Sequence, residues 1–422
     1  MAERIEQYLD EVGAHVRWKR VRPALTQELR THLEEQAEAY RAEGLPAAEA
    51  EAEAVLQMGD AEQIGLALDA VHRPKRQTAI LSLAGICILL GAIFRILSQD
   101  FPKLFTLAAL VLTAGLLLGG YYFDYRRLAR YAWQIYGVVL ALGAVCLSRS
   151  FHLANGIGIE LGISMGIENE YVVLLFPLAY ALAVYALRGK RGGFVLALYA
   201  GVPFIAFLHL SDMAPIYQVS FFSRLILRVG LTAVLLIAIR AGFFRVKAGW
   251  ACAAVLALLA LGVYLDVRSS TSRLASYFSP EAMQLWRSLA QKQPFADQLM
   301  NRTLRQLQQA GLSSAVPAWV WMGLLVGPMA AFLALLLVRA AKLTHPLGKL
   351  LSLPAALLLV IRFVPGVLYQ LSLFPLAAPL PFITGNLYSV IDALLLGLSV
   401  SALRQSTCPE PPEIRSVQPA VV

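Results

Sequence analysis

The stretch that decides the fold is residues 346–403, PLGKLLSLPAALLLVIRFVPGVLYQLSLFPLAAPLPFITGNLYSVIDALLLGLSVSAL. Two apolar runs in it, 349–371 and 383–403, are each long enough to cross a bilayer. The link between them contains Pro375, Pro379 and Pro381, so it cannot be helical throughout. Non-helical backbone at membrane depth is tolerated only where protein or a wet cavity covers it. We therefore expect the sequence PLPFITGN in this link to line a covered site.

The composition places most of the chain in a membrane. Of the 422 residues, 58% are hydrophobic and 15% are charged, and a soluble domain of this size could not bury so much apolar surface. We predict an all-α polytopic membrane protein of about ten transmembrane helices. The ten candidate spans are residues 78–97, 104–123, 131–148, 171–188, 194–210, 222–243, 248–266, 316–339, 349–371 and 383–403.

Basic residues gather in alternate connections between these spans. By the positive-inside rule the side that carries them is cytoplasmic, and both termini fall on that side. The residues concerned are Arg73, Lys75, Arg76, Arg126, Arg127, Arg130, Arg188, Lys190, Arg191, Arg245, Lys247, Arg339, Lys342, Lys349 and Arg404.

Residues 1–77 are predicted to form a separate soluble module. They hold 15 acidic and 10 basic residues, a net charge of about −5, whereas the rest of the chain is about +14. Helices are predicted at about 23–43 and 47–58, and a further one is capped by Asp60. Residues 28–68 are similar to the permease-prefix or HAAS-type domain that precedes varied bacterial membrane proteins. We expect a cytoplasmic helical domain, then a membrane domain over 78–404 and a cytoplasmic tail over 405–422.

The motif PLPFIT resembles the SEDS family (shape, elongation, division and sporulation), the RodA-like, FtsW-like and SpoVE-like membrane proteins. That family carries a PLPFISYGG-type motif at the start of its last helix. Pro379 to Ile383 match it, Thr384 replaces Ser, and Gly385 and Asn386 stand where Tyr-Gly-Gly would begin. Ten spans with both ends inside agree with the family's architecture. The resemblance implies a protein of the bacterial cytoplasmic membrane that acts in cell-wall synthesis, cell division, cell shape or sporulation.

Two loops on the outer side carry polar candidates. Glu170 lies in LGISMGIENEYVVL, which aligns with the family's LGPFSFQPSELAKL-type motif, although Val173 stands where the family has Lys. An ordinary connecting loop is the alternative. The extracellular loop 267–315 carries about +4, which could hold a lipid pyrophosphate or simply attract anionic headgroups. Its candidate residues are Glu281, Asp297, Arg287, Arg302 and Arg305.

Ionisable residues inside spans are costly and therefore informative. Arg362 lies mid-span and Asp392 lies one turn into the last span. An ion pair between them would neutralise both, and we prefer this structural role to a direct role on substrate. Asp212, in LHLSDMAP, resembles the Asp of the family's QPDLGT-type motif. No His, Cys or carboxylate stands at metal-ligand spacing, so we predict neither a metal nor a cofactor.

The resemblance also implies a chemistry. SEDS proteins polymerise lipid II, and a carboxylate in a DFxFA-like motif that opens the eighth span is thought to act as the base, with a Glu-Glu pair after it. Here the run is AWVWMGLLVG, with Ala318 where the Asp would be. Val326 and Gly327 stand where the acidic pair would be. The catalytic residue is therefore unknown.

Three hypotheses remain open. The first is a divergent SEDS protein without conserved catalysis, in contact with membrane lipids and with a penicillin-binding protein or division-complex partner. The second is an active lipid II peptidoglycan glycosyltransferase that uses a displaced carboxylate. The third is a transporter or flippase of a lipid-linked substrate. The sequence has no Gly-rich nucleotide loop and no nucleic-acid-binding motif.

Overall fold

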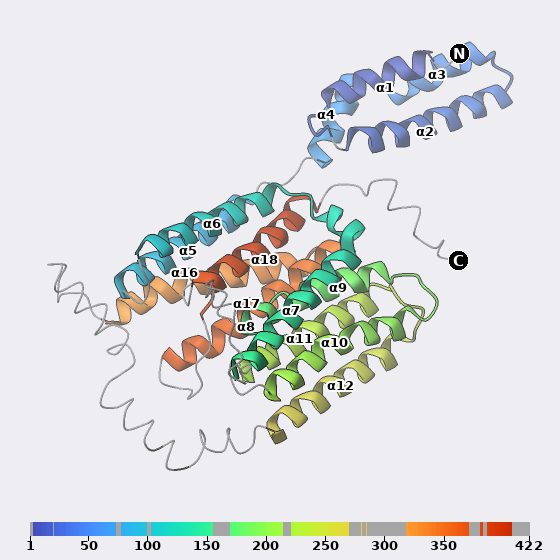
Figure 1. Cartoon of the computed structure of the whole chain (residues 1–422). Helices are drawn as coiled ribbons and strands as arrows, with labels where there is room; N and C mark the ends of the chain where they lie inside the picture. The colour runs from blue at the N-terminus through green and yellow to red at the C-terminus, as the bar shows by residue number, and fades with distance from the viewer. Residues whose placement is uncertain are drawn as a thin grey trace. The chain divides into compact units, whose positions relative to one another are not determined.

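The structure is a computed structural model (Figure 1). It describes residues 3–19, 21–72, 77–98, 103–154, 169–213, 221–269, 280, 284, 318–370, 380–382 and 386–406. Every element in these ranges is a helix and none of these residues lies in a strand, so the predicted all-α fold is confirmed. The chain divides into two compact units, residues 1–76 with 404–422 and residues 77–403.

The first unit contains four helices, α1 (Glu3–His15), α2 (Arg22–Ala42), α3 (Ala47–Met58) and α4 (Ala61–His72). Leu9, Val12 and Leu33 lie in their shared core. The backbone N–H of Gln63 donates to the Asp60 carboxylate at 3.2 Å, so the predicted cap of α4 is present. These helices are amphipathic, and their packing buries one apolar face of each.

The second unit contains ten long helical stretches among the described residues, and they match the ten predicted spans in order (Figure 1). They are α5 (Thr78–Ser98), α6 (Lys103–Tyr122), α7 (Ala132–Ala154), α8 (Asn169–Val173) continued by α9 (Phe176–Ala186), α10 (Gly193–Met213), α11 (Phe221–Arg240), α12 (Ala248–Ser269), α16 (Ala318–Ala341), α17 (Pro346–Gln370) and α18 (Asn386–Arg404). A 3₁₀ segment, η1 (Tyr125–Tyr131), precedes α7.

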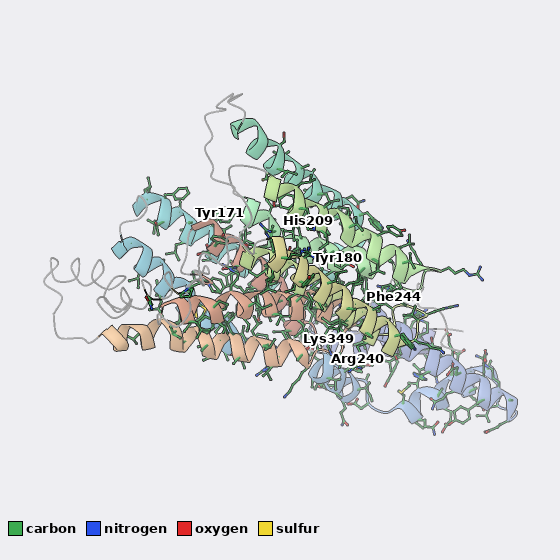
Figure 2. All side chains as sticks on the ribbon, turned by 90° about the horizontal axis from the view of Figure 1, so that it is seen from below. Tyr171, Tyr180, His209, Arg240, Phe244 and Lys349 are labelled. Carbon is green, nitrogen blue, oxygen red and sulfur yellow. The ribbon has the colours of Figure 1, made fainter. Side chains whose placement is uncertain are left out.

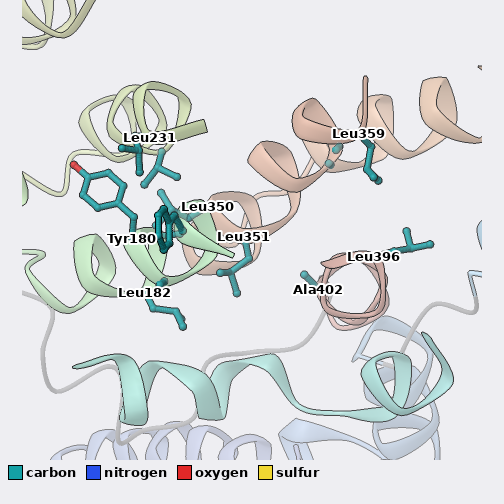
Figure 3. Close-up of a cluster of buried hydrophobic side chains, with 14 of the residues drawn as sticks. Tyr180, Leu182, Leu231, Leu350, Leu351, Leu359, Leu396 and Ala402 are labelled. Atoms are coloured by element: carbon teal, nitrogen blue, oxygen red, sulfur yellow. The ribbon is translucent and has the colours of Figure 1, made fainter. Parts of the chain in front are cut away.

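Helix α9 lies inside the bundle and packs against α7, α10, α11 and α17. Nearly all of its residues are buried, as expected for a helix that is apolar on every side. Figure 3 shows Tyr180 and Leu182 of α9 in one buried cluster with Leu231 of α11 and Leu351 of α17. This central helix packs against α11 and α17, the helices that carry Arg228 and Arg362 of the polar groups described below.

The outer helices expose apolar side chains. Five of the described helices are long and apolar enough to cross a membrane, and three shorter apolar helices lie at 78–93, 171–186 and 326–341. Large exposed hydrophobic residues occur along α6, α7, α10 and α12, for example Val111, Val138, Tyr199 and Leu258. In water such a surface would be unfavourable, whereas in a bilayer it faces lipid. The protein is therefore a multi-pass membrane protein.

Helices α6 and α18 cross at two glycines. A Cβ atom built on Gly120 would lie 2.7 Å from the Cα of Gly397, and one built on Gly397 would lie 2.9 Å from the carbonyl oxygen of Leu116. Such a separation is too short for any larger residue without a shift of the backbone. Small residues at helix crossings are the usual basis of close packing in membranes.

Candidate functional site

The candidate site lies where α17 and α18 face each other. Arg362 donates through Nη1 to Oδ1 of Asp392, and the two side chains are 1% and 0% exposed. The ion pair that the sequence suggested is present. In an apolar interior each charge would be very costly alone, so the pair neutralises both. A role of these residues on a substrate path stays a prediction.

The same carboxylate holds the Pro-rich link. Oδ2 of Asp392 accepts a hydrogen bond from the backbone N–H of Phe382 at 3.2 Å, and Ser389 Oγ donates to the carbonyl oxygen of Phe382 at 3.1 Å. Phe382 has φ 60°, a left-handed conformation that non-glycine residues seldom adopt. Its side chain is fully buried. The turn Leu380–Phe382 is thus fixed onto α18 by two side chains of that helix.

Two tyrosines complete this cluster. The guanidinium of Arg362 lies 5.0 Å from the ring centroid of Tyr388, and the ring of Tyr388 lies 4.4 Å from that of Tyr171 on α8. Within the described residues, Nε and Nη2 of Arg362 have no hydrogen-bond partner. The cluster joins α8, α17, α18 and the turn Leu380–Phe382. Its carboxylate, Asp392, already accepts two hydrogen bonds and is poorly placed to serve as a general base.

A second intramembrane ion pair was missed by the sequence reasoning. Arg228 of α11 makes a two-point contact with Asp266 of α12, with Nη2 2.8 Å from Oδ1, and both side chains are buried. The available signal was an arginine near the start of the sixth span. A carboxylate at the end of the seventh span was its natural partner, because sequential antiparallel helices bring those two positions together.

A groove of about 710 Å³ lies next to this pair, between α10, α11 and α12. Its lining is mostly apolar, with His209, Thr232 and Arg228 as polar exceptions. Gly262 of α12 makes room for the guanidinium, since a Cβ at that position would lie 2.5 Å from Nη1 of Arg228. The groove and the pair are therefore parts of one local arrangement.

The other predicted site residues are placed only in part. Glu170 lies in α8 and Asp212 in the last turn of α10, but their side chains lie outside the described residues. Glu281, Asp297, Arg287, Arg302 and Arg305 all fall outside the described residues. Val173, where the family has Lys, is fully buried. Within the described part of the chain, no group of three or more His, Cys, Asp or Glu residues could hold a metal ion.

The fold and the polar cluster define a polytopic helical membrane protein with charges paired inside its bundle. No protein-family model matches the chain, and no curated protein matches it. Solved structures do share the fold. One comes from a peptidoglycan synthase complex that coordinates polymerization and crosslinking (TM-score 0.51, 19% identity, 78% of this chain and 98% of that chain).

Two others are Thermus thermophilus rod shape determining protein RodA and a variant of it. The variant gives a TM-score of 0.51 with 18% identity over 79% of this chain and 98% of its own. The unaltered RodA gives 0.50 with 18% identity over 79% and 97%. The chain therefore has a RodA-like fold.

Proposed function

We propose that this chain acts in bacterial cell-wall synthesis, division, shape or sporulation as a divergent SEDS-like membrane protein that does not itself polymerise glycan. The RodA-like fold and the match over Pro379–Thr384 support the placement in this group. One observation supports the proposal that the chain lacks catalysis. Helix α16 begins at Ala318, where the family motif has its carboxylate, and none of the 24 residues of α16 is acidic.

The buried carboxylates do not replace the missing base. Asp392 is paired with Arg362 and holds the Phe382 amide, and Asp266 is paired with Arg228. Because the oxygens of both carboxylates are engaged and buried, neither is placed to reach the hydroxyl of an acceptor sugar. Removal of a general base alone typically costs about 10²- to 10⁴-fold in rate. The chain is thus expected to show little turnover.

The retained helices point to a binding role. A protein that keeps ten packed helices and the turn Leu380–Phe382 without the base can still present a surface to a partner in the membrane. The resemblance to the SEDS family implies that this partner is a penicillin-binding protein or another division-complex component, with lipid II as a further ligand. Co-purification of the full-length chain with such a partner is the expected result.

The decisive experiment is a polymerisation assay. Purified full-length protein is incubated with lipid II, with and without a cognate penicillin-binding protein, and glycan chains are resolved on a gel. We expect no chains beyond the level of the partner alone, and no effect of Asp297→Ala or Glu281→Ala in cells. Long chains from the wild-type protein that Asp297→Ala abolishes would establish the displaced-carboxylate glycosyltransferase instead.

The orientation in the membrane is also a proposal. The basic connections support a cytoplasmic location of both termini. Reporter fusions at Gly192, at Ala248 and at the C-terminus should report the cytoplasm, and fusions at Gly158 and Gln291 the exterior. An exterior signal at Gly192 would contradict the ten-span arrangement.

A transporter or flippase is the second candidate function. The observation that favours it is the apolar groove beside the buried pair of Arg228 and Asp266. Intramembrane charges often mark substrate paths. Reconstituted vesicles with a fluorescent lipid-linked substrate test this function directly, because flipping without polymerisation would support it over the binding role.

A further inference from the structure

Two tight turns at one end of the membrane bundle are locked together. One joins α9 to α10 and the other joins α11 to α12. The backbone N–H of Gly189 donates to the carbonyl oxygen of Phe243 at 2.9 Å, which ties the first turn to the second. Gly189 has φ 69°, so the turn uses a conformation that glycine adopts without strain.

Two pairs of aromatic rings pack beneath these turns. Phe243 packs edge-on against Tyr185, and Phe244 against Phe194, each with ring centroids 5.8 Å apart. Both phenylalanines are buried. The hydrogen bond and the two ring pairs therefore hold the turns at a fixed separation, so their outward-facing side chains form one preorganised surface.

That surface is strongly basic. We call it the basic plate, and it consists of Arg188, Lys190, Arg191, Arg240, Arg245 and Lys247. Five of the six are exposed, and the guanidinium of Arg188 lies 3.8 Å from the ring centroid of Tyr185. None of the six has an ion-pair partner among the described residues. Figure 2 shows Arg240, Phe244 and a further cation, Lys349, toward the same end of the bundle, away from Tyr171 and His209.

No carboxylate can neutralise the plate from its own helices. The sequence has no Asp or Glu between residues 171 and 211 or between 213 and 265. The acidic residues that flank these segments, Glu170, Asp212 and Asp266, belong to the opposite ends of the helices. Six like charges on two fixed turns repel one another, and a bound anion would relieve that repulsion.

The surface directly beside the plate is apolar. Val195 and Leu196, one turn after Arg191, are 52% and 46% exposed, and Trp250, three residues after Lys247, is 79% exposed. Tryptophan at such a position is typical of the boundary between a bilayer and water. A ligand that contacts both surfaces needs an anionic head and hydrocarbon chains.

We propose that the basic plate is a binding site for an anionic phospholipid of the adjacent leaflet, with a preference for a headgroup that carries two phosphates. The two locked turns each contribute three cations, so two phosphate groups can be held at once by Arg and Lys donors. The chains of the lipid would lie along the exposed apolar faces of α10 and α12.

Native mass spectrometry of the purified full-length protein tests this site. Cardiolipin, phosphatidylglycerol and phosphatidylcholine are titrated separately, and the dissociation constant of the first bound lipid is measured. We expect cardiolipin to bind tighter than phosphatidylglycerol, and phosphatidylcholine to bind weakest. The double variant Arg191→Gln/Lys247→Gln removes one exposed cation from each turn. Each cation near an anionic headgroup contributes about fivefold to the affinity, so loss of two should raise the dissociation constant for cardiolipin roughly 25-fold.

The matched control is Arg127→Gln/Lys342→Gln, which removes two exposed cations from other connections. It should change cardiolipin binding less than threefold on the proposal. An equal loss in both double variants would show general charge attraction and overturn the site. Unchanged cardiolipin binding in Arg191→Gln/Lys247→Gln would also overturn it, even if that variant loses an acidic protein partner. Because the cations are exposed, circular dichroism of both variants should match the wild type.

Discussion

Asp392 on α18 links helix α17 to the turn Leu380–Phe382. One of its carboxylate oxygens accepts a hydrogen bond from the Arg362 guanidinium of α17, and the other accepts one from the backbone N–H of Phe382. All three residues are buried. The cost of this arrangement depends on whether both charges are present. A buried pair contributes little against an apolar replacement, whereas a single unpaired charge left in the same place is strongly destabilising.

Removal of one partner should therefore destabilise the protein more than removal of both. We expect Asp392→Leu or Arg362→Met alone to lower the free energy of unfolding by about 3–5 kcal/mol, and the double variant to recover most of that loss. Thermal denaturation of detergent-solubilised protein measures this. Asp392→Asn keeps an acceptor for the Phe382 amide but leaves Arg362 unpaired, so it should resemble Asp392→Leu. A double variant as unstable as the sum of the singles would refute the pairing argument.

The crossing of α6 and α18 gives a test at two neighbouring glycines. Gly120→Ala places a Cβ 2.7 Å from the Cα of Gly397 and should cost about 1–3 kcal/mol through overpacking. Gly119→Ala meets nothing within 4 Å and should be neutral, or stabilising by up to about 1 kcal/mol, because alanine favours the helix. Melting temperatures of both variants are compared in the same detergent. Equal effects would mean that this crossing is not close.

Gly262 and the ion pair of Arg228 and Asp266 should be coupled. Gly262→Ala puts a Cβ 2.5 Å from Nη1 of Arg228, which must move away from Asp266, so we expect a loss of about 1–3 kcal/mol. In the background Arg228→Met/Asp266→Leu that loss should disappear. Gly249→Ala on the same helix meets nothing within 4 Å and serves as control. A loss of the same size in both backgrounds would show that the two sites are independent.

The buried phenol of Tyr8 should make the stability of the first unit depend on pH. Residues 1–77 should form a soluble helical fragment by themselves. Burial raises the pKa of the Tyr8 phenol, and the charges of Asp60 and Glu11 raise it further. The folded fragment therefore holds this proton more tightly than the unfolded one. Its stability should be complete below pH 10 and should fall as the pH rises above the ordinary tyrosine value.

Circular dichroism melts of the fragment between pH 7 and 11 measure this loss. In Tyr8→Phe, which has no ionisable phenol, the loss above pH 10 should shrink. A random-coil spectrum of the wild-type fragment at pH 7 would instead argue against a separate module.

The sequence by itself determined the class of the protein and the order of its helices. Apolar length is a local property, so ten runs in the sequence could be assigned to ten helices without knowledge of their packing. The prolines before Phe382 likewise predicted a non-helical link. Arg362 and Asp392 could be paired in advance, because they lie on consecutive spans and each is too costly to leave alone.

The tertiary structure decided which groups meet across the bundle. The hydrogen bond from Phe382 to Asp392 depends on the left-handed turn that brings the link back onto α18. The basic plate needs two turns, more than fifty residues apart, to be locked by one hydrogen bond and two ring pairs. The roles of Glu170, Asp212 and the residues of the 267–315 loop remain predictions. Contacts between distant segments arise from helix packing over the whole unit, and no local pattern of residues encodes them.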